Sequence, residues 1–538
     1  MDDKNLLPVM ILGGGPTGLT LALELVRRGV SCRVLDPLPA GSERARGGVV
    51  LGSTLDILRV VGVDESSFSS QDHSRGVSFF SRGDRIGALE VSPKGARYDF
   101  EVVLSGREVE ELLLAPLAAA GVEVEHGVEL IDFTRDALTA TGMFRRSDGS
   151  RETIQAGWMI GCDGRHGMTR RLLGESLSSL GESSYWAVMD CRLEGRPLED
   201  RRVCVLLDRG VFALIPLRAD RWRAYFEPSS DSSDLLQDLQ AGLDLHLPGA
   251  QAQDPTAMQR FQSGGWIASR YRHGRVLLAG EEAHHWSPIE GHGLNTDIQD
   301  AHNLGWKLAL IEMGVCDDTL LESYELERRS VAEAIVASGD QNVAILQEEE
   351  RVGRASIRPE NTALRRSSNT SRHWAEATSE LLLSYRCSPI VSGEDAPHPH
   401  NPSPGDRFPP AGFASKSNGE LCSLQDLCDR TLHTILCLVR GELDGAGREA
   451  LSKLIAVAKE HSGLIGRLLI VADGPSPHEE FGEVWLQAEN AKPFSVLGDE
   501  PASTLLVRPD LYLGYRCRGF QPEALEEYLA LLRLGRTA

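Results

Sequence analysis

The sequence predicts an α/β fold, α+β overall, in which a parallel-sheet domain carries an inserted antiparallel sheet and is followed by a small C-terminal α/β domain. Apolar runs such as Val9–Leu12 and Cys32–Leu35 alternate with helical patterns over residues 1–175, as they do in parallel α/β units. Short β-rich runs separated by turn residues gather instead at 77–104 and 184–226, which indicates a separate antiparallel sheet.

The order of these segments sets the expected domain bounds. A chain of 538 residues exceeds what one core usually organises, so we expect two or three domains. A buried-strand pattern at Val276–Ala279 and a long helical stretch follow the antiparallel segments, so the first domain is predicted to be discontinuous. We expect this domain over 1–75, 105–175 and 270–390, the inserted sheet domain over 76–104 and 176–269, a Pro-, Ser- and His-rich linker over 388–412, and the C-terminal domain over 413–538.

Composition and charge argue against several classes of protein. Lys and Arg number 56 against 78 Asp and Glu, a net charge of -22, so nucleic acid is not an expected partner. The N-terminal apolar run follows an acidic start and breaks at three glycines, which predicts neither a signal peptide nor a membrane span, and we expect a cytoplasmic protein. Ten cysteines occur without a Cys-x-x-Cys pair, which argues against a zinc ribbon or a dithiol redox centre.

A glycine-rich turn follows the first apolar run and opens an amphipathic helix. Gly13 permits a tight turn, Gly15 lets a pyrophosphate approach the backbone, and Gly18 lets the helix pack closely on the strand. Amides at the helix start would meet the negative charge of the phosphates. The residues of this turn expected to contact a cofactor are Gly13, Gly15, Pro16, Thr17 and Gly18.

Asp36 stands at the end of the second predicted strand. A carboxylate there can accept hydrogen bonds from ribose hydroxyls. Strand, glycine turn, helix and acid together predict a Rossmann-type dinucleotide site rather than a chance Gly-rich turn. This fingerprint by itself does not choose between NAD and FAD.

Three further segments resemble, in order, the motifs of the para-hydroxybenzoate hydroxylase family, the group A flavoprotein aromatic monooxygenases. Residues 44–58 resemble the region in which arginines reach the FAD pyrophosphate, and Gly161–Gly164 with Arg170 resembles the Asp-Gly motif. Gly280–His284, continued to Leu308, looks like the Gly-Asp motif that wraps the ribityl chain and the flavin ring.

The resemblance implies FAD as the resident cofactor, NADPH or NADH as co-substrate, and O₂. Arg44 and Arg46 would grip phosphate, with ordinary surface cations as the alternative. Arg107 fits an Arg or Gln that opens a helix beside FAD in relatives, with a surface arginine as the alternative. The residues assigned to FAD by resemblance are Arg44, Arg46, Arg107, Asp163, Gly280, Glu281, Pro288, Gly291, Gly293, Leu294 and Asn295.

The same resemblance implies a monooxygenase. In the family, NAD(P)H reduces the flavin, O₂ adds to give a C4a-hydroperoxide, and an electron-rich ring attacks its distal oxygen while water is excluded. We therefore expect hydroxylation of a phenolic or polyketide-type aromatic in a pocket formed by the inserted sheet. The alternatives are Baeyer-Villiger or epoxidising chemistry on the same fold, and a flavin- or aromatic-ligand-binding protein without turnover.

No catalytic base follows from the sequence. Tyr185, Tyr225 and His292 are the candidates, and each also suits a structural role. The histidines His284, His285 and His292 suggest a metal, but no ligand spacing supports zinc, so we expect none.

The C-terminal segment resembles the thioredoxin-like domain of phenol and polyketide hydroxylases, on Pro404–Arg407 and Leu506–Asp510. Because it lacks a Cys-x-x-Cys pair, a packing or homodimer role is expected in place of a redox role.

Two residues depart from the family pattern. Glu281 replaces the usual Asp and is expected to keep the carboxylate that accepts a ribityl hydroxyl hydrogen bond. Glu290 replaces a usual Gly. Pointing inward it would disfavour the reduced anionic flavin, and the alternative is that it turns to solvent.

Overall fold

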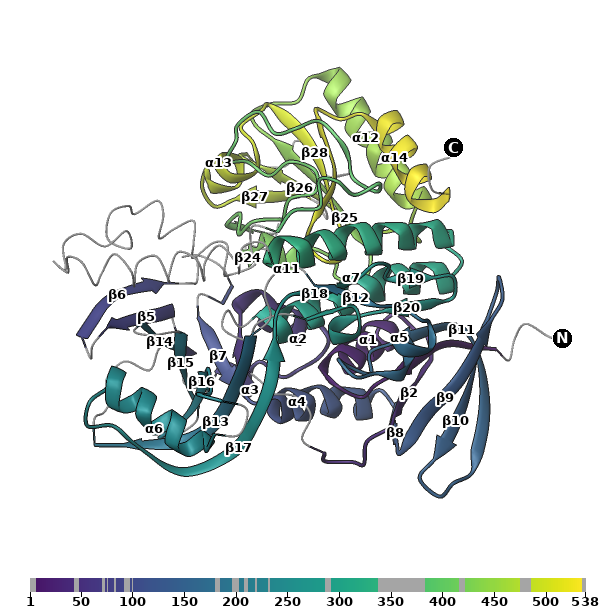
Figure 1. Cartoon of the computed structure of the whole chain (residues 1–538). Helices are drawn as coiled ribbons and strands as arrows, with labels where there is room; N and C mark the ends of the chain where they lie inside the picture. Colours follow the sequence, from purple (N-terminus) through teal and green to yellow (C-terminus); the bar gives the residue numbers. More distant parts are fainter. Residues whose placement is uncertain are drawn as a thin grey trace. The chain divides into compact units, whose positions relative to one another are not determined.

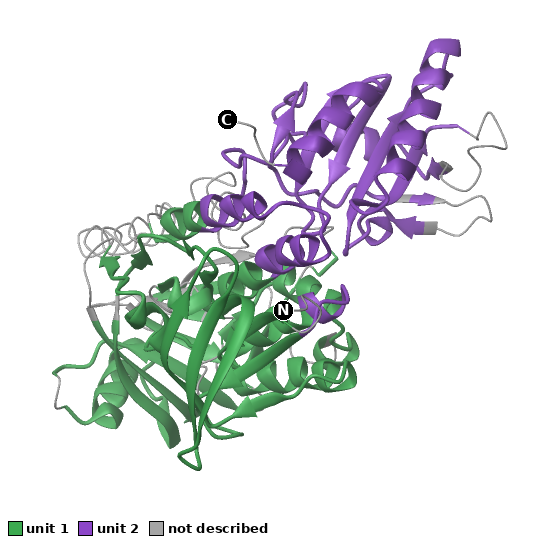
Figure 2. Ribbon diagram, turned by 90° about the vertical axis from the view of Figure 1, so that its right-hand side faces the viewer, with its two compact units in different colours: residues 1–23, 32–301, 329–381 green, residues 24–31, 302–328, 382–538 purple. Residues whose placement is uncertain are grey.

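The computed structural model describes residues 6–42, 48–69, 73–74, 76–81, 84–90, 97–98, 100–179, 184–195, 203–207, 211–217, 220–230, 233–285, 292–336, 383–415, 421–474 and 485–534. The chain divides into two compact units (Figure 2). Unit 1 comprises Met1–Leu23, Cys32–Ala301 and Arg329–Leu381, and unit 2 comprises Glu24–Ser31, His302–Arg328 and Leu382–Ala538.

A mostly parallel sheet organises the first part of unit 1. Its central strands run in the order β20-β11-β1-β2-β8, all parallel, with β19 antiparallel at one edge and β9 and β10 attached to β11. Strand β1 is buried on both faces, as strands of a covered parallel sheet are. The strands are β1 (Leu7–Leu12), β2 (Cys32–Asp36), β8 (Val124–His126), β9 (Val128–Arg135), β10 (Ala140–Arg146), β11 (Arg151–Gly161), β19 (Arg272–His273) and β20 (Val276–Leu278).

Two helices that begin at strong start signals follow the expected pattern. Helix α1 (Pro16–Val26) has Pro at its first position, where the missing N–H costs nothing. Helix α4 (Gly106–Ala119) begins with a capping box between Ser105 and Glu108, which satisfies two amides at the helix start.

A seven-stranded sheet lies in the same unit, in the order β17-β13-β16-β15-β14-β5-β6, and is antiparallel except between β14 and β5. This confirms the predicted inserted sheet. One face packs on α6 (Leu235–His246) through a buried apolar cluster that includes Met189, Leu214 and Trp222 (Figure 1). The strands are β5 (Gly76–Ser81), β6 (Asp84–Glu90), β13 (Ser184–Glu194), β14 (Val203–Leu207), β15 (Val211–Pro216), β16 (Arg221–Phe226) and β17 (Gln251–Ser263).

Shorter elements complete unit 1. Helix α7 (His292–Glu312) contributes its residues up to Ala301 to this unit and the rest to unit 2. The others are β3 (Gly48–Val50), α2 (Gly52–Val60), α3 (Ser66–Ser69), β4 (His73–Ser74), β7 (Glu101–Leu104), α5 (Met168–Leu172), β12 (Leu177–Ser179), β18 (Trp266–Ala268), η2 (Gly280–Glu282) and β21 (His284–His285).

Unit 2 is built on a mixed eight-stranded sheet in the order β22-β29-β28-β25-β26-β27-β23-β24. Central β25 pairs with β26 in parallel and with β28 antiparallel. Buried clusters cover both faces, as the predicted thioredoxin-like domain requires. Its elements are η4 (Asp318–Leu321), β22 (Ser392–Gly393), β23 (Phe413–Ser415), β24 (Leu421–Ser423), α11 (Leu424–Leu427), β25 (His433–Val439), α12 (Gly445–Glu460), β26 (Ile465–Ala472), β27 (Trp485–Ala488), α13 (Lys492–Leu497), β28 (Ala502–Val507), β29 (Leu513–Arg518) and α14 (Pro522–Leu534).

The segment 388–412 differs from the expected linker, because it packs as part of unit 2. Phe408 and Ala411 are almost fully buried, and the amide of Phe408 donates to the carbonyl of Leu511. The segment lacks periodicity because its backbone pairs irregularly with its neighbours. Its composition therefore resembles that of an exposed linker.

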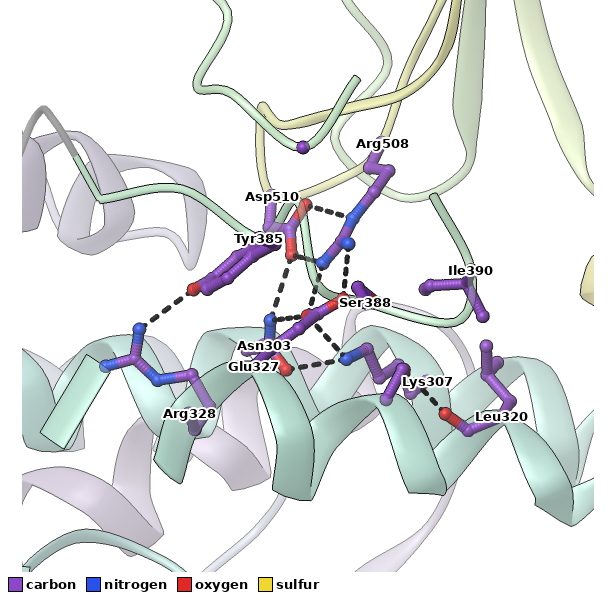
Figure 3. Close-up of polar contacts among 12 residues, drawn as sticks. Asn303, Lys307, Leu320, Glu327, Arg328, Tyr385, Ser388, Ile390, Arg508 and Asp510 are labelled. Atoms are coloured by element: carbon purple, nitrogen blue, oxygen red, sulfur yellow. Dashed lines mark hydrogen bonds and ion pairs between the residues drawn. The ribbon is translucent and has the colours of Figure 1, made fainter. Parts of the chain in front are cut away.

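A buried charge network, which we call the Glu327 network, links several segments of unit 2 (Figure 3). The Glu327 carboxylate accepts two hydrogen bonds from Arg508, at 2.6 and 2.8 Å, and one from Lys307 at 2.8 Å. Asn303 and Ser388 also donate to it, at 2.8 and 2.6 Å. The network further contains Asp510, whose carboxylate accepts hydrogen bonds from Arg508 and from the Trp306 indole N–H.

None of the described helices is long and apolar enough to cross a membrane. All ten cysteines are free thiols, and only Cys387 is exposed.

Candidate functional site

Three turns of unit 1 lie against one another at the carboxyl ends of β1, β11 and β20. A Cβ added to Gly13, whose φ is +111°, would lie 2.2 Å from the carbonyl oxygen of Cys162 and 2.9 Å from the Asp163 nitrogen. A Cβ added to Gly280 would lie 2.6 Å from Thr17 Oγ1. The glycine turn, the Asp163–Gly164 turn and the Gly280–Glu281 turn therefore form one site, at the sheet edge where α/β folds bind ligands.

The glycine turn has the geometry that the sequence predicts. A Cβ on Gly18 would lie 2.0 Å from the carbonyl oxygen of Gly13, so helix and strand are too close for a side chain there. A Cβ added to Gly15 would meet no atom within 4 Å, which leaves its backbone accessible to a pyrophosphate. The first amides of α1 have no intrahelical partner and suit an anion. These residues fit the diphosphate of FAD, and the individual contacts stay predictions.

Asp36 is fully buried and bonded to backbone. Its Oδ2 accepts from the Gly14 amide at 2.7 Å, and its Oδ1 accepts from the Leu38 amide at 2.8 Å. The carboxylate thus fixes the glycine turn. A carboxylate oxygen can accept more than one hydrogen bond, so the predicted contact with ribose stays a prediction.

Asn295, near the start of α7, holds a strand in place. Its Oδ1 accepts from the Leu51 amide at 2.9 Å, and its Nδ2 donates to the carbonyl of Val49 at 2.8 Å. That strand, β3, directly follows the segment of the two predicted phosphate arginines. Gly293 and Leu294 lie in the same helical turn, and a Cβ on Gly293 would meet nothing within 4 Å.

Several predicted cofactor residues lie outside the described residues, and their roles remain predictions. They are Arg44, Arg46, Pro288, Glu290 and Gly291.

Arg107 occupies the first turn of α4, as predicted. Its side chain is 60% exposed, and its Nε donates to Glu111 Oε1 at 2.8 Å, one helical turn away. This geometry suits the alternative of a surface arginine, and the contact with FAD stays a prediction.

The Gly280–Glu281 turn is anchored by Asp300, a residue that the sequence reasoning did not single out. Asp300 is fully buried, and its Oδ2 accepts from the Gly280 amide at 3.1 Å and lies 2.6 Å from His284 Nε2. His284 is therefore a hydrogen-bonded core histidine. Its neighbour His285 stacks on Trp266 at 4.4 Å, and the described residues contain no cluster suited to a metal.

The three candidate bases lie in different surroundings. Tyr185 on β13 is 57% exposed, whereas Tyr225 on β16 and His292 at the start of α7 are buried. Side-chain alternation places Tyr185 with the α6 face of the sheet and Tyr225 on the opposite face. The structure therefore does not bring the two tyrosines together.

Beside Tyr225, the same face carries an ion pair that the sequence did not reveal. Asp190 and Arg223 are cross-strand partners, with Nε to Oδ1 at 2.7 Å and Nη2 to Oδ2 at 2.9 Å. Burial lowers the pKa of Arg223, but the hydrogen bonds from its guanidinium to Asp190 outweigh this and the pKa is raised. The Arg223 Nη1 is buried and has no hydrogen-bond partner among the described residues.

Comparisons with known proteins agree with this geometry. Residues 7–338 match the family described as FAD binding domain. The chain is 27% identical over 517 residues to pentachlorophenol 4-monooxygenase of Sphingobium chlorophenolicum, covering 94% of this chain and 93% of that protein. It is 31% identical over 344 residues to 6-methylpretetramide 4-monooxygenase of Streptomyces rimosus, covering 61% and 60%.

A solved structure shares the fold over almost the whole chain. The flavin-dependent monooxygenase PieE in complex with FAD and substrate superposes with a TM-score of 0.79 at 20% identity, covering 98% of each chain. At this identity the likeness shows the fold alone.

Proposed function

Because the chain belongs to the FAD binding domain family, and with it to the group A flavoprotein hydroxylases, we propose that it is an NAD(P)H-dependent monooxygenase that hydroxylates a phenolic or polyketide-type aromatic compound. Its cofactor is FAD. The observation that carries the proposal for the substrate is the buried Arg223–Asp190 pair beside Tyr225, on the face of the inserted sheet opposite α6.

FAD, when bound, would take a hydride from NADPH or NADH and activate O₂, so that one oxygen atom enters the ring and the other leaves as water. The chain's own residues would orient the ring. Arg223 offers a buried cationic N–H, and Asp190 holds the guanidinium in one orientation. A buried cation favours a substrate oxygen in its anionic form, and an ionised phenol is the more electron-rich and reactive ring. Tyr225, two residues along the strand, is the proposed relay for the phenol proton: its hydroxyl oxygen would accept that proton while its own O–H proton passes on to solvent.

The two relatives support a phenolic ring as the shared chemistry. One is named for a chlorinated phenol and the other for a pretetramide, and the phenol-named relative matches the chain over nearly its full length.

Consumption of NADH and NADPH by the purified holoenzyme tests the proposal, measured without and with phenol, chlorophenols and a polycyclic phenol. We expect slow oxidation of the nicotinamide alone, acceleration by the right phenol, and a product heavier by one oxygen atom that derives from O₂. If no aromatic compound accelerates the oxidation and no oxygenated product forms, the proposal is wrong. A lactone or an epoxide as product would point to the alternative chemistries.

Arg223→Met tests the substrate role of the ion pair, with Arg221→Met on the same strand as the matched control. Loss of a hydrogen bond to a charged group costs about 1.5–3 kcal/mol, so kcat/KM for phenols should fall roughly ten- to hundred-fold in Arg223→Met. Arg221 bonds Thr256 and backbone carbonyls, and its substitution should leave kcat/KM within a few-fold of wild type.

Two further expectations from the sequence stay proposals. Sedimentation of the holoenzyme tests whether the protein forms a homodimer, and fractionation of the source cells tests a cytoplasmic location.

A further inference from the structure

Two carboxyl groups, one partly buried and one fully buried, meet beside the cofactor site of unit 1. Asp163 stands in the turn after β11, and Glu282 ends η2 with no exposed surface. A Cβ on Gly167 would lie 2.4 Å from Asp163 Cγ and 2.6 Å from Glu282 Oε1, so both carboxyl groups approach the same glycine. Asp163 Oδ2 also lies 2.6 Å from that position, so the two carboxyl groups are neighbours.

Only one oxygen of each group is supplied with donors. Asp163 Oδ2 accepts from the amides of Met168 and Thr169, at 2.6 and 3.1 Å, and Glu282 Oε1 accepts from the amide of Arg170 at 2.8 Å. The other two oxygens, Asp163 Oδ1 and Glu282 Oε2, are buried and receive no hydrogen bond from the described residues. A buried acceptor without a donor is costly, so two of them in neighbouring carboxyl groups call for a proton.

The charges around the pair do not remove this need. Arg170 is the nearest cation, with Nε 3.4 Å from Glu282 Oε2, but the pair falls short of hydrogen-bond geometry. Helix α7 places Asp297 and Asp300 in the same region. Burial, followed by the charges of Asp163, Glu282, Asp300 and Asp297, raises the pKa of the Cys162 thiol, so all four carboxyl groups lie near it. One cation therefore faces several carboxylates, and His284 is already engaged with Asp300.

We propose that Glu282 is protonated in the folded protein and donates a hydrogen bond to Asp163, and that this shared proton holds the Asp163–Gly164 turn in the position that receives FAD. Burial, followed by the charge of Asp163, raises the pKa of Glu282 to about 9, in agreement with this arrangement. Glu282 is thus a positioning residue that acts through Asp163.

The turn that the proton would hold lies against two parts of the FAD site. The Asp163 nitrogen is 2.9 Å from the position of a Cβ on Gly13, and Glu281 Oε2 is 3.9 Å from the position of a Cβ on Gly164. If Glu282 loses its proton, two adjacent carboxylates repel each other and the turn shifts against the glycine turn. FAD affinity should then fall.

The direction of the pH effect follows from the raised pKa. The unfolded chain releases the Glu282 proton near 4.5 and the folded protein keeps it to about 9. The stabilisation by this proton is therefore fully present below pH 4.5 and declines as the pH rises, until it is lost above about 9. The folding constant of wild type, divided by that of a variant that cannot ionise at position 282, should fall about ten-fold per pH unit in this window.

The test is the dissociation constant of FAD, measured from neutral pH to well above the titration near pH 9, for wild type and Glu282→Gln. Gln keeps an N–H donor toward Asp163 and cannot ionise. We expect equal affinity within about three-fold at neutral pH, and a loss of at least about ten-fold at high pH in wild type alone. At neutral pH the infrared absorption of protonated carboxyls in wild type should contain a component that is lost in Glu282→Gln, while the component of Glu101, whose pKa burial raises to about 8, remains.

Glu101→Gln is the matched control. Glu101 on β7 is a second buried carboxyl of unit 1, and burial raises its pKa to about 8. Its substitution should change the pH dependence of stability but leave the pH profile of FAD affinity as in wild type.

Equal loss of FAD at high pH in wild type and Glu282→Gln would overturn the proposal, and so would an unchanged carboxyl band. If Glu282→Gln does not fold, wild type alone decides, since an FAD affinity that stays flat through the titration near pH 9 is incompatible with the proposal. No substrate is needed, so the outcome does not depend on the proposed reaction.

Discussion

Two buried groups of charges, one in each unit, differ in how completely they are hydrogen-bonded. In unit 2 the Glu327 carboxylate accepts from Arg508, Lys307, Asn303 and Ser388. In unit 1 the Asp163–Glu282 pair retains two buried oxygens to which none of the described residues donates. Glu327 and Glu282 are both fully buried, so the supply of donors and cations is what separates them.

The difference shows what keeps a buried carboxylate charged. Burial would raise the pKa of Glu327, but Arg508 and Lys307 outweigh it and lower the pKa well below its ordinary value. Burial raises the pKa of Glu282, and the single neighbouring cation does not offset it. A network with enough donors fixes its charges, whereas a pair short of donors takes up a proton.

The largest effect is expected from removing the main cation of the Glu327 network. Arg508→Met would leave Glu327 and Asp510 buried with Lys307 alone, and loss of one partner from a buried ion pair costs about 3–5 kcal/mol. Urea unfolding, followed by a probe in unit 2, measures this. The control is Arg386→Met, because the Arg386–Asp406 pair has an arginine side chain that is 56% exposed and should contribute under about 1 kcal/mol. Equal costs for the two variants would contradict the comparison.

The second prediction is that the two regions respond to pH with opposite signs. Burial, partly offset by Glu327, lowers the pKa of Lys307 from 10.5 to about 8. Between these values the unfolded chain binds the proton and the folded protein does not, so the Lys307 contribution to stability rises with pH. The free energy of unfolding of wild type minus that of Lys307→Met should increase by about 1.4 kcal/mol per pH unit in this range. A difference that stays constant over this range would show that the network keeps Lys307 charged.

The smallest effect is expected at Glu281, the exposed neighbour of Glu282. Substitutions of Glu281 test a direct contact with FAD, whereas substitutions of Glu282 test a buried proton. Glu281→Ala should weaken FAD about ten- to hundred-fold through loss of one charged acceptor, and Glu281→Asp should retain FAD. Neither should alter the pH profile of FAD affinity. Fluorescence titration of FAD measures both variants. Glu129→Ala is the control, since Glu129 is partly exposed and pairs with Arg145 on the neighbouring strand at 2.6 Å. An FAD affinity unchanged in Glu281→Ala would remove the predicted ribityl contact.

The local sequence was sufficient for the architecture and for the glycine turn of the predicted cofactor site. The spacing of Gly13, Gly15 and Gly18 determines a turn that only glycine can form, because Cβ atoms at Gly13 and Gly18 would overlap backbone. Strand and helix periodicity likewise predicted the inserted sheet and the C-terminal domain. These features follow from residues close together in the chain, whose patterns repeat with the period of the element.

The tertiary structure alone decided the pairs that connect distant segments. Arg223 meets Asp190 through the register of β13 and β16, Glu282 meets Asp163 across two turns, and Arg508 meets Glu327 at a separation of 181 residues. Segment 388–412 has the composition of a linker, yet Phe408 and Ala411 are buried and its backbone hydrogen-bonds within unit 2. Composition and periodicity report on the local chain, whereas the charge state of a buried side chain depends on which donors packing brings to it, and no local pattern encodes that partner.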